Sequence, residues 1–439
     1  MPLTATEPII LFWHRRDLRL HDNAGLYYAL KTGHRVLPVF IFDRQILDPL
    51  EDRRDRRVAF IHREIHRLQQ ELTGMGSTII TRYGNPLDVW KELLNTYPIA
   101  AVYTNYDYEV YAKNRDHAVY QLLKERGVGF ELYKDQAIFD HDEVLTGNGN
   151  PYTVFTPYSR NWQRKLNDFY LKSYPTERYF NQFCQTPPQP VPSLEEMNFQ
   201  PVHESFPVPT VGAELLRNYQ KMREYPAQTG TSELGIHLRF GTISVRDLAR
   251  QAQNHSPTFL NELTWRDFYF QVLDHFPHVE KHSFRREYDR IPWRNDPEEI
   301  ERWCAGQTGY PIVDAGMRQL NQTGWMHNRV RMITASFCCK HLLIDWRIGE
   351  AYFARKLRDY DRSANNGGWQ WAAGSGTDAA PYFRVFNPTL QAQKFDPQGE
   401  YVRRWVPELD APSYPKPVVD HTFARSRAIQ TYQDALRNA

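Results

Sequence analysis

The first part of the chain alternates short apolar runs with longer amphipathic segments. The apolar runs fall at 9–13, 36–42, 78–81, 100–104 and 130–132. Between the second and third runs, apolar residues recur at helical spacing from Arg57 to Leu72. Short strands separated by helices are typical of a parallel, right-handed, doubly wound sheet. The pattern therefore predicts an α/β N-terminal domain built on a five-stranded parallel sheet.

The connections in this region do not resemble a Rossmann dinucleotide site. No GxGxxG motif follows the first apolar run. The nearest glycine pair, Gly74 and Gly76, falls at the end of the helix predicted over 57–72. The Rossmann fingerprint needs its glycines directly after the first strand. We therefore do not expect this sheet to hold a dinucleotide in the Rossmann manner.

The pattern of apolar and polar residues changes twice in the rest of the chain. Residues 135–205 are rich in proline and have few periodic runs, which is typical of a long surface connector. The later region is mostly helical in pattern, with loop breaks expected at 291–293 and 365–368. We predict an α/β domain over 1–134, a connector over 135–205 and an all-α domain over 206–439.

Composition narrows the class of protein. The formal net charge is only +2, so any contact with nucleic acid must come from a local basic face. No apolar run reaches about 18 residues, and the N-terminus lacks a basic start followed by a long apolar stretch. We therefore expect a soluble, cytoplasmic protein without a signal peptide. The four cysteines lack CxxC spacing and fit free thiols better than a zinc site or a disulfide framework.

Aromatic residues are abundant, at 14% of the chain with 11 tryptophans. Large packed cores would explain this composition, and so would base stacking, chromophore packing or electron transfer. Composition leaves these alternatives open.

The first segment with candidate chemistry is GTSELG at 230–235. It precedes a predicted helix that Thr231 or Ser232 could cap, and the free N–H groups of that helix could hold an anion. An ordinary capped helix explains the same residues.

A second segment lies at 261–269. On a helix, its residues Glu262, Trp265, Arg266 and Tyr269 share one face. A face that mixes a carboxylate, a guanidinium and two aromatic rings suits a polar cavity, although a salt-bridged surface would show the same pattern.

A third segment, GWMHNRVRM, lies at 324–332. Asn328 and Met332 are four residues apart and so face the same way, whereas Arg329 is expected to point elsewhere. Asn offers both a donor and an acceptor, which suits reading a pyrimidine edge. His327 by itself is more often structural than catalytic.

The fourth segment combines Asp359 and Asp361 with the run NNGGWQW at 365–371. The carboxylates could form a buried ion pair with an arginine. The run of small and polar residues before two tryptophans is unusual for a helix.

In this order and spacing, the motifs resemble the photolyase/cryptochrome family over essentially the whole chain. The sequence is most similar to microbial class I photolyases that act on cyclobutane pyrimidine dimers (CPDs). The resemblance is densest in GQTGYPIVDA at 306–315, WMHNR at 325–329, NNGGWQW at 365–371 and FNP at 386–388. The stretch WHRRDLRLHDN at 13–23 also fits the opening of the family.

The resemblance implies an N-terminal antenna domain and a helical C-terminal domain that binds FAD. Asp359 and Arg331 match a salt bridge beside the flavin ring, and Asn365 matches the residue that faces flavin N5. Plant cryptochromes commonly have Asp at that position, and the neutral Asn favours the reduced, anionic flavin that repair requires. The positions that match cofactor contacts are Tyr219, Thr231, Ser232, Glu233, Leu234, Gly235, Arg331, Asp359, Tyr360, Asp361 and Asn365.

The substrate side is also implied by the resemblance. Glu262 matches the acid that hydrogen-bonds the dimer, and Trp265 and Trp371 match the tryptophans that flank it. Asn328 and Met332 match further substrate contacts of CPD enzymes, without the histidine pair of (6-4) photolyases. The positions that match contacts with the DNA backbone are Arg223, Arg329 and Arg384. The positions that match a chain carrying electrons from the surface to the flavin are, counted outward from the flavin, Trp369, Trp346 and Trp293.

Together these matches predict a light-driven, FAD-dependent enzyme that splits CPDs in DNA, acts as a monomer and holds no metal. A second, antenna chromophore is expected near 105–113, where Tyr111 and Ala112 replace the Asn-Glu often found in folate-binding relatives. This replacement speaks against folate, whereas a deazaflavin, a second flavin and an empty site remain open.

Two other functions fit the same family of folds. A cryptochrome photoreceptor would predict Asp at position 365 and altered substrate residues. A flavoprotein oxidoreductase without DNA would lack the substrate constellation.

Overall fold

The computed structural model describes residues 7–437. The first six residues, on which the expectation of no signal peptide partly rests, lie outside this range. The chain forms two compact units. The first comprises the residues up to Asp140 with 165–210 and 234–254, and the second comprises 141–164, 211–233 and the chain from His255 onward. The boundaries expected at 134 and 205 stay predictions. No helix in the described range is long and apolar enough to cross a membrane.

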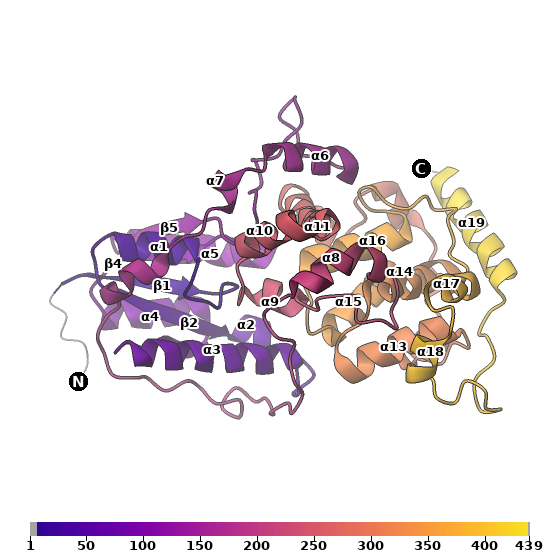
Figure 1. Ribbon diagram of the computed structural model, residues 1–439, viewed down its shortest axis with the longest axis horizontal. Helices are drawn as coiled ribbons and strands as arrows, with labels where there is room; N and C mark the ends of the chain where they lie inside the picture. The colour runs from indigo at the N-terminus through magenta and orange to yellow at the C-terminus, as the bar shows by residue number, and fades with distance from the viewer. Residues whose placement is uncertain (1–6, 438–439) are drawn as a thin grey trace. The chain divides into compact units, whose positions relative to one another are not determined.

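The first unit contains a five-stranded parallel sheet in the order β3-β2-β1-β4-β5, which confirms the predicted α/β fold (Figure 1). The strands are β1 (Ile9–His14), β2 (Val36–Asp43), β3 (Ile80–Gly84), β4 (Ile99–Asn105) and β5 (Gly129–Tyr133). Strand β3 begins two residues later than predicted. The side-chain oxygen of Gln69 accepts hydrogen bonds from the Thr78 hydroxyl and the Ile79 N–H, so that stretch is bonded to a helix and not to the sheet.

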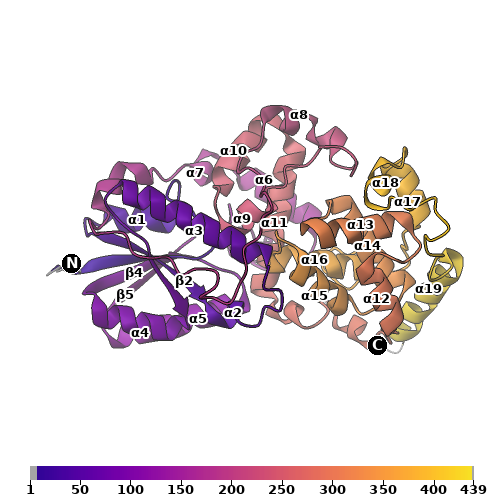
Figure 2. The ribbon, with the colours of Figure 1, turned by 90° about the horizontal axis from the view of Figure 1, so that it is seen from below.

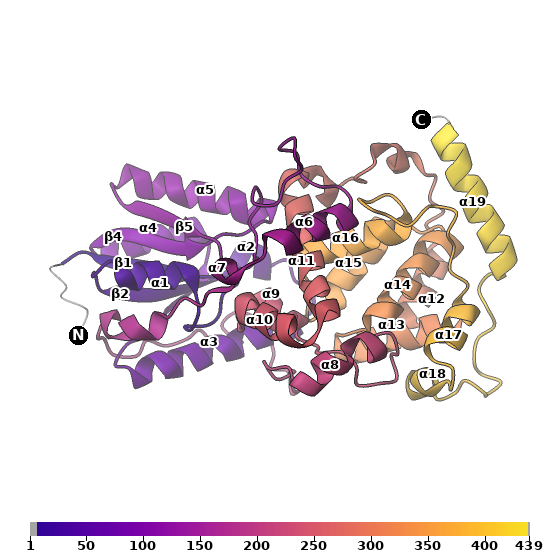
Figure 3. The same ribbon diagram turned by 45° about the horizontal axis from the view of Figure 1, so that its top comes forward.

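Helices cover both faces of this sheet because its strand side chains alternate between the faces. Ile10 and Phe12 pack with α1 (Ala24–Lys31) and α3 (Arg56–Gly74), whereas Leu11 and Trp13 pack with α4 (Pro86–Thr96) and α5 (Val110–Glu125). Figures 2 and 3 show the two helix pairs on opposite sides of the strands. The short helix α2 (Arg44–Leu47) follows β2.

The later segments of the first unit form α7 (Asp168–Leu171), the 3₁₀ helix η1 (Thr176–Gln182), α9 (Gly235–Phe240) and α10 (Val245–His255). The expectation that Thr231 or Ser232 caps a helix is wrong. Helix α9 begins at Gly235, and its N-cap residue is Leu234, which makes no side-chain capping bond. The reason is that Glu233 adopts a left-handed conformation, with φ of 52°, which separates both hydroxyl residues from the helix.

The second unit is a bundle of helices. Helix α16 packs against α11, α14 and α15, and so lies at the centre of the unit (Figure 3). The α-helices are α6 (Phe155–Lys165), α8 (Ala213–Met222), α11 (Pro257–His275), α12 (Pro297–Ala305), α13 (Pro311–Thr323), α14 (Asn328–Ser336), α15 (Trp346–Lys356), α16 (Arg362–Ala373), α17 (Pro388–Phe395), α18 (Glu400–Trp405) and α19 (His421–Arg437). The shorter helices are η2 (Pro277–Glu280), η3 (Arg286–Arg290) and the π-helix η4 (Phe337–His341).

One of the two predicted loop breaks is wrong. The break at 291–293 is confirmed, but residues 365–368 lie inside α16. Asp361 starts that helix by accepting hydrogen bonds from the backbone N–H groups of Ser363 and Ala364. Gly367 in this helix serves packing and not a turn. A Cβ on Gly367 would come within 2.2 Å of the Tyr269 ring.

Candidate active site

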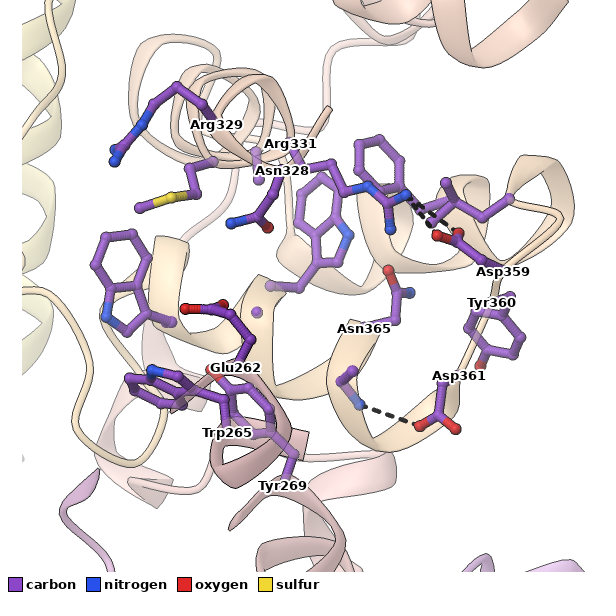
Figure 4. Close-up of a pocket in the computed structure, with 18 of the residues that line it drawn as sticks. Glu262, Trp265, Tyr269, Asn328, Arg329, Arg331, Asp359, Tyr360, Asp361 and Asn365 are labelled. Carbon is purple, nitrogen blue, oxygen red and sulfur yellow. Dashed lines mark hydrogen bonds and ion pairs between the residues drawn. The ribbon is translucent and has the colours of Figure 1, made fainter. Parts of the chain in front are cut away.

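A cavity of about 390 Å³ opens in the helical unit (Figure 4). Its lining includes residues of helices α11, α14 and α16, the segment 357–361, and Arg223 at the end of α8. The structure places most of the predicted site residues in this lining. They are Arg223, Glu262, Trp265, Asn328, Arg329, Arg331, Met332, Asp359, Tyr360, Asp361, Asn365, Trp369 and Trp371.

Other predicted residues lie outside the lining of this cavity: Tyr219, Thr231, Ser232, Glu233, Leu234, Gly235, Trp346, Trp293 and Arg384. Tyr219 packs edge-on against Phe259, with ring centroids 5.0 Å apart. Arg384 is exposed, and its guanidinium lies 5.5 Å from the Phe386 ring centroid. The roles assigned to this second group stay predictions.

Helix α11 supplies an acid and an aromatic wall. The Glu262 carboxylate forms an ion pair with Arg223, and burial raises the Glu262 pKa although this arginine opposes the shift. One turn later, Trp265 stacks face to face on Phe155 of α6, with centroids 3.5 Å apart and planes 6° apart. Phe155 therefore sets the plane of the Trp265 ring. Sequence reasoning missed Phe155, because nothing in the sequence shows that α6 packs on α11.

Arg266 does not share this wall, contrary to the expectation from helical spacing. Its guanidinium lies 4.5 Å from the Phe270 ring centroid, and Arg266 is outside the lining. A cation is attracted to the face of an aromatic ring, and this ring lies one turn further along the helix.

Helix α14 starts with a structural histidine. His327 is the N-cap, and its Nδ1 accepts a hydrogen bond from the Arg329 N–H at 3.1 Å. Burial lowers the His327 pKa to about 4, so the ring is neutral and can accept at neutral pH. Asn328 and Met332 both face the cavity, as predicted.

The expectation that Arg329 points away from Asn328 and Met332 is wrong, because Arg329 also lines the cavity. Its Nε donates to Glu224 at 2.7 Å, and its guanidinium lies 4.3 Å from the Phe395 ring centroid. These two contacts fix the position of the Arg329 guanidinium.

An ion pair closes another side of the cavity. Arg331 donates to Asp359 at 2.8 Å, and its Nε donates to the Met326 carbonyl oxygen at 2.8 Å. The salt bridge inferred from the resemblance is therefore present. Neighbouring Arg358, which sequence reasoning missed, forms an ion pair with Glu233 at 2.6 Å. It ties the turn at 230–233 to the cavity segment 357–361.

Helix α16 supplies the remaining side. Asn365 and Trp369 are one helical turn apart, and Gly368 lies between them. Figure 4 shows Asn365, Glu262 and Asn328 pointing into the same space from three helices. The Asn365 amide donates to Glu350 of α15, a residue that no sequence motif indicated.

Comparison with known proteins agrees with this arrangement. Residues 10–178 match the family described as DNA photolyase, and residues 259–413 match the FAD binding domain of DNA photolyase. The deoxyribodipyrimidine photo-lyase of Halobacterium salinarum is 37% identical, with 97% of this chain and 99% of that protein covered. The enzyme of the same name from Escherichia coli is 38% identical, with 97% and 99% covered. The chain belongs to the DNA photolyase family.

Solved structures of photolyases share the fold. A class III photolyase from Agrobacterium tumefaciens superposes with a TM-score of 0.86 at 31% identity, over 99% of this chain and all of that chain. A photolyase from Sulfolobus tokodaii that contains two FAD molecules gives a TM-score of 0.79 at 34% identity, over 97% of this chain and 99% of that one. These matches confirm the predicted fold class.

The cavity of this photolyase fits FAD. A Cβ on Gly368 would meet no atom within 4 Å, so it would project into open space that a flat ring system can use. Asn365 offers hydrogen bonding beside that space, and the Arg331–Asp359 pair adds a fixed cation. These residues would hold the isoalloxazine ring of the cofactor.

The predicted electron-transfer tryptophans of this photolyase belong to one hydrophobic core. Trp369 and Trp346 are buried in it, and Trp293 packs against it. Trp369 also meets Trp303 edge-on at 6.0 Å, a residue that sequence reasoning missed. Trp293 was expected at the surface, but it is half-buried because Tyr432 of α19 packs edge-on against it at 5.9 Å.

Proposed function

We propose that this photolyase repairs cyclobutane pyrimidine dimers in DNA by light-driven electron transfer. One observation carries the proposal. The residues expected to hold the cofactor, Asn365 and Trp369, line the same cavity as the residues expected to hold the dimer, Glu262, Trp265 and Trp371. An electron donor and its acceptor would therefore lie side by side.

When bound, FAD supplies the light absorption and the electron that opens the cyclobutane ring. The chain's own residues bind and orient the lesion. Trp265 and Trp371 offer aromatic faces for stacking, which tolerates any pyrimidine pair. A dimer already disturbs base stacking, so extruding it costs less than flipping a normal base.

In its protonated form, Glu262 is suited to donate a hydrogen bond to the dimer. Burial raises its pKa, and its present partner is Arg223. When Arg223 turns to a DNA phosphate, the carboxyl loses that cation and its pKa rises further. The protonated acid can then donate to a pyrimidine carbonyl oxygen, where negative charge develops. Asn328 and Met332 contact the same lesion from α14.

Arginines hold the DNA backbone. Arg223, Arg329 and Arg384 are the proposed phosphate contacts, and the acids now paired with Arg223 and Arg329 keep those guanidinium groups near the cavity.

We also propose that the enzyme acts as a monomer in the cytoplasm. The four free cysteines, all in the described part of the chain, suit a reducing compartment.

A second chromophore is proposed as an antenna in the first unit. Its identity stays open between a deazaflavin, a second flavin and folate, of which folate is disfavoured by Tyr111 and Ala112, and an empty site is the remaining alternative. Absorbance spectra of the chromophores released from the purified protein would distinguish them.

The function is tested with reduced enzyme and oligonucleotides that carry a single defined lesion. Under blue light, we expect the CPD to be converted to two pyrimidines and the (6-4) product to remain. Chromatography measures both. The variant Glu262→Gln, which keeps the shape of the side chain, should repair the CPD more slowly. Repair of the (6-4) lesion alone, or of neither lesion, would contradict the proposal.

A further inference from the structure

Asn365 is held by the neighbouring helix. Its Nδ2 donates to the Glu350 carboxylate at 2.9 Å and to the Glu350 backbone carbonyl oxygen at 3.2 Å. Both acceptors belong to one residue of α15, and helices α15 and α16 pack directly on each other. The amide therefore makes two hydrogen bonds on the side that faces away from the cavity.

These contacts decide which way the amide points. An amide has a nitrogen that only donates and an oxygen that only accepts. Burial raises the Glu350 pKa, while Asn365, Arg362 and the Tyr360 hydroxyl oppose that shift and Glu280 adds to it. A backbone carbonyl, however, can only accept, whatever the charge of the carboxyl group. The nitrogen must face Glu350, and so Oδ1 of Asn365 faces the cavity.

We propose that Glu350 is a positioning residue that makes Asn365 present a hydrogen-bond acceptor to the flavin, and that this favours the reduced cofactor. The inference rests on the proposed function, in which Asn365 faces the N5 edge of the ring. Oxidised flavin has a bare nitrogen at that edge, which would repel a second acceptor. Reduced flavin has an N–H there, which donates to Oδ1.

The proposal predicts the direction of a redox shift. If Glu350 acted only through its negative charge, its removal would make the site more attractive to electrons and raise the midpoint potential of FAD. If Glu350 acts by holding the amide, removal of its carboxylate leaves only the longer bond to the backbone carbonyl oxygen, so Asn365 turns more easily and the potential falls. The two explanations therefore have opposite signs.

The experiment measures the midpoint potential of bound FAD by spectroelectrochemistry. In Glu350→Leu, the equilibrium ratio of reduced to oxidised FAD should fall by about three- to tenfold, which is about 15–30 mV for a two-electron couple. Glu350→Gln keeps an acceptor oxygen and should shift the ratio less, in the same direction. It also covers the case in which Glu350→Leu does not fold. Glu280→Gln is the matched control, because Glu280 is a nearby acid that acts electrostatically on Glu350, whereas the Asn365 amide donates to Glu350 itself.

A double variant tests whether Glu350 affects the FAD potential through Asn365. In an Asn365→Leu background, Glu350→Leu should cause no further fall in potential. An unchanged or raised potential in the single Glu350 variants would overturn the proposal, as would a full extra fall in the double variant. Failure of the proposed function would look different, because the unmodified enzyme would then not repair a CPD even after chemical reduction.

Discussion

Single residues in this cavity act through the neighbours that hold them. Trp265 shows this clearly, because its ring plane is set by Phe155, a residue from a distant part of the sequence. Glu350 has the same relation to Asn365. Residues behind the lining therefore matter as much as those that touch a ligand.

Replacing Phe155 tests this view of the aromatic wall. In Phe155→Ala, the Trp265 ring loses its stacking partner, which is worth about 0.5–1.5 kcal/mol for an aromatic pair. We expect affinity for CPD-containing DNA to fall about three- to tenfold while affinity for undamaged DNA stays the same. Fluorescence anisotropy with matched oligonucleotides measures both. Phe169→Ala removes an exposed ring from the first unit and serves as the control. Equal losses on both DNAs would contradict this role.

Trp293 is the proposed outer end of the electron chain. Trp293→Phe keeps an aromatic ring but makes it much harder to oxidise. We expect light-driven reduction of oxidised FAD to be strongly slowed, and CPD repair to survive when FAD is reduced beforehand with dithionite. Flavin absorbance under blue light with a thiol reductant gives the first measurement. Normal photoreduction would show that another ring, such as the adjacent Tyr432, can serve as donor.

At the scale of elements, helix α16 combines two glycines with different tasks. Gly368→Ala adds a methyl group that meets no atom within 4 Å, and alanine is the better helix former by about 0.8–1.0 kcal/mol. We expect the FAD-free protein to become slightly more stable in urea, whereas FAD content after purification falls. Gly367→Ala is the matched control and should destabilise the protein, because its methyl group would overlap the Tyr269 ring. Full FAD retention in Gly368→Ala would contradict the placement of the cofactor.

The π-helix η4 carries a buried lysine that links three elements. Lys340 donates to the carbonyl oxygens of Ala373 at 2.8 Å and Tyr382 at 3.3 Å, and its Nζ lies 3.7 Å from the Tyr432 ring centroid. Burial lowers its pKa to about 7 from an ordinary value of 10.5. The unfolded chain therefore takes up this proton at a higher pH than the folded protein does.

This difference in proton uptake makes the stability of the protein depend on pH. Between pH 10.5 and 7, only the unfolded state carries the proton, so this residue reduces stability as the pH falls, and below pH 7 its effect is constant. Lys340→Met removes the proton site. Its stability relative to the unmodified protein should improve by on the order of 3 kcal/mol from pH 10 to pH 7. Chemical unfolding at several pH values measures this. Parallel profiles for the two proteins would contradict it.

At the scale of the whole molecule, a net charge of +2 gives little long-range attraction to DNA. Binding must then depend on a few local arginines. Arg384→Ala should flatten the log–log dependence of affinity on salt by about 0.9, the value for one lost phosphate contact. Titrations from low to moderate salt measure the slope. Arg403→Ala, another exposed arginine of the helical unit, should leave it unchanged. Weaker binding of Arg384→Ala with an unchanged slope would exclude a phosphate contact.

The sequence by itself determined the α/β sheet, because alternating apolar positions and short strand spacing reflect local geometry. It also indicated most cavity residues, since the polar faces of α11 and α14 repeat at helical spacing and the family motifs are dense there. It failed at 365–368, where small polar residues suggested a loop. Only packing shows that Gly367 lies against Tyr269 and that these residues continue α16.

Tertiary structure alone decided which side chains support the site. Phe155 and Trp265 are 110 positions apart, and Glu350 lies 15 positions before Asn365. The partners of Arg329 and Arg266 likewise depend on which acid or ring is nearest in space. Helical spacing states which side chains share a face, because that follows from local backbone geometry. It does not determine which residues that face contacts, because those contacts depend on how distant segments pack together in the core.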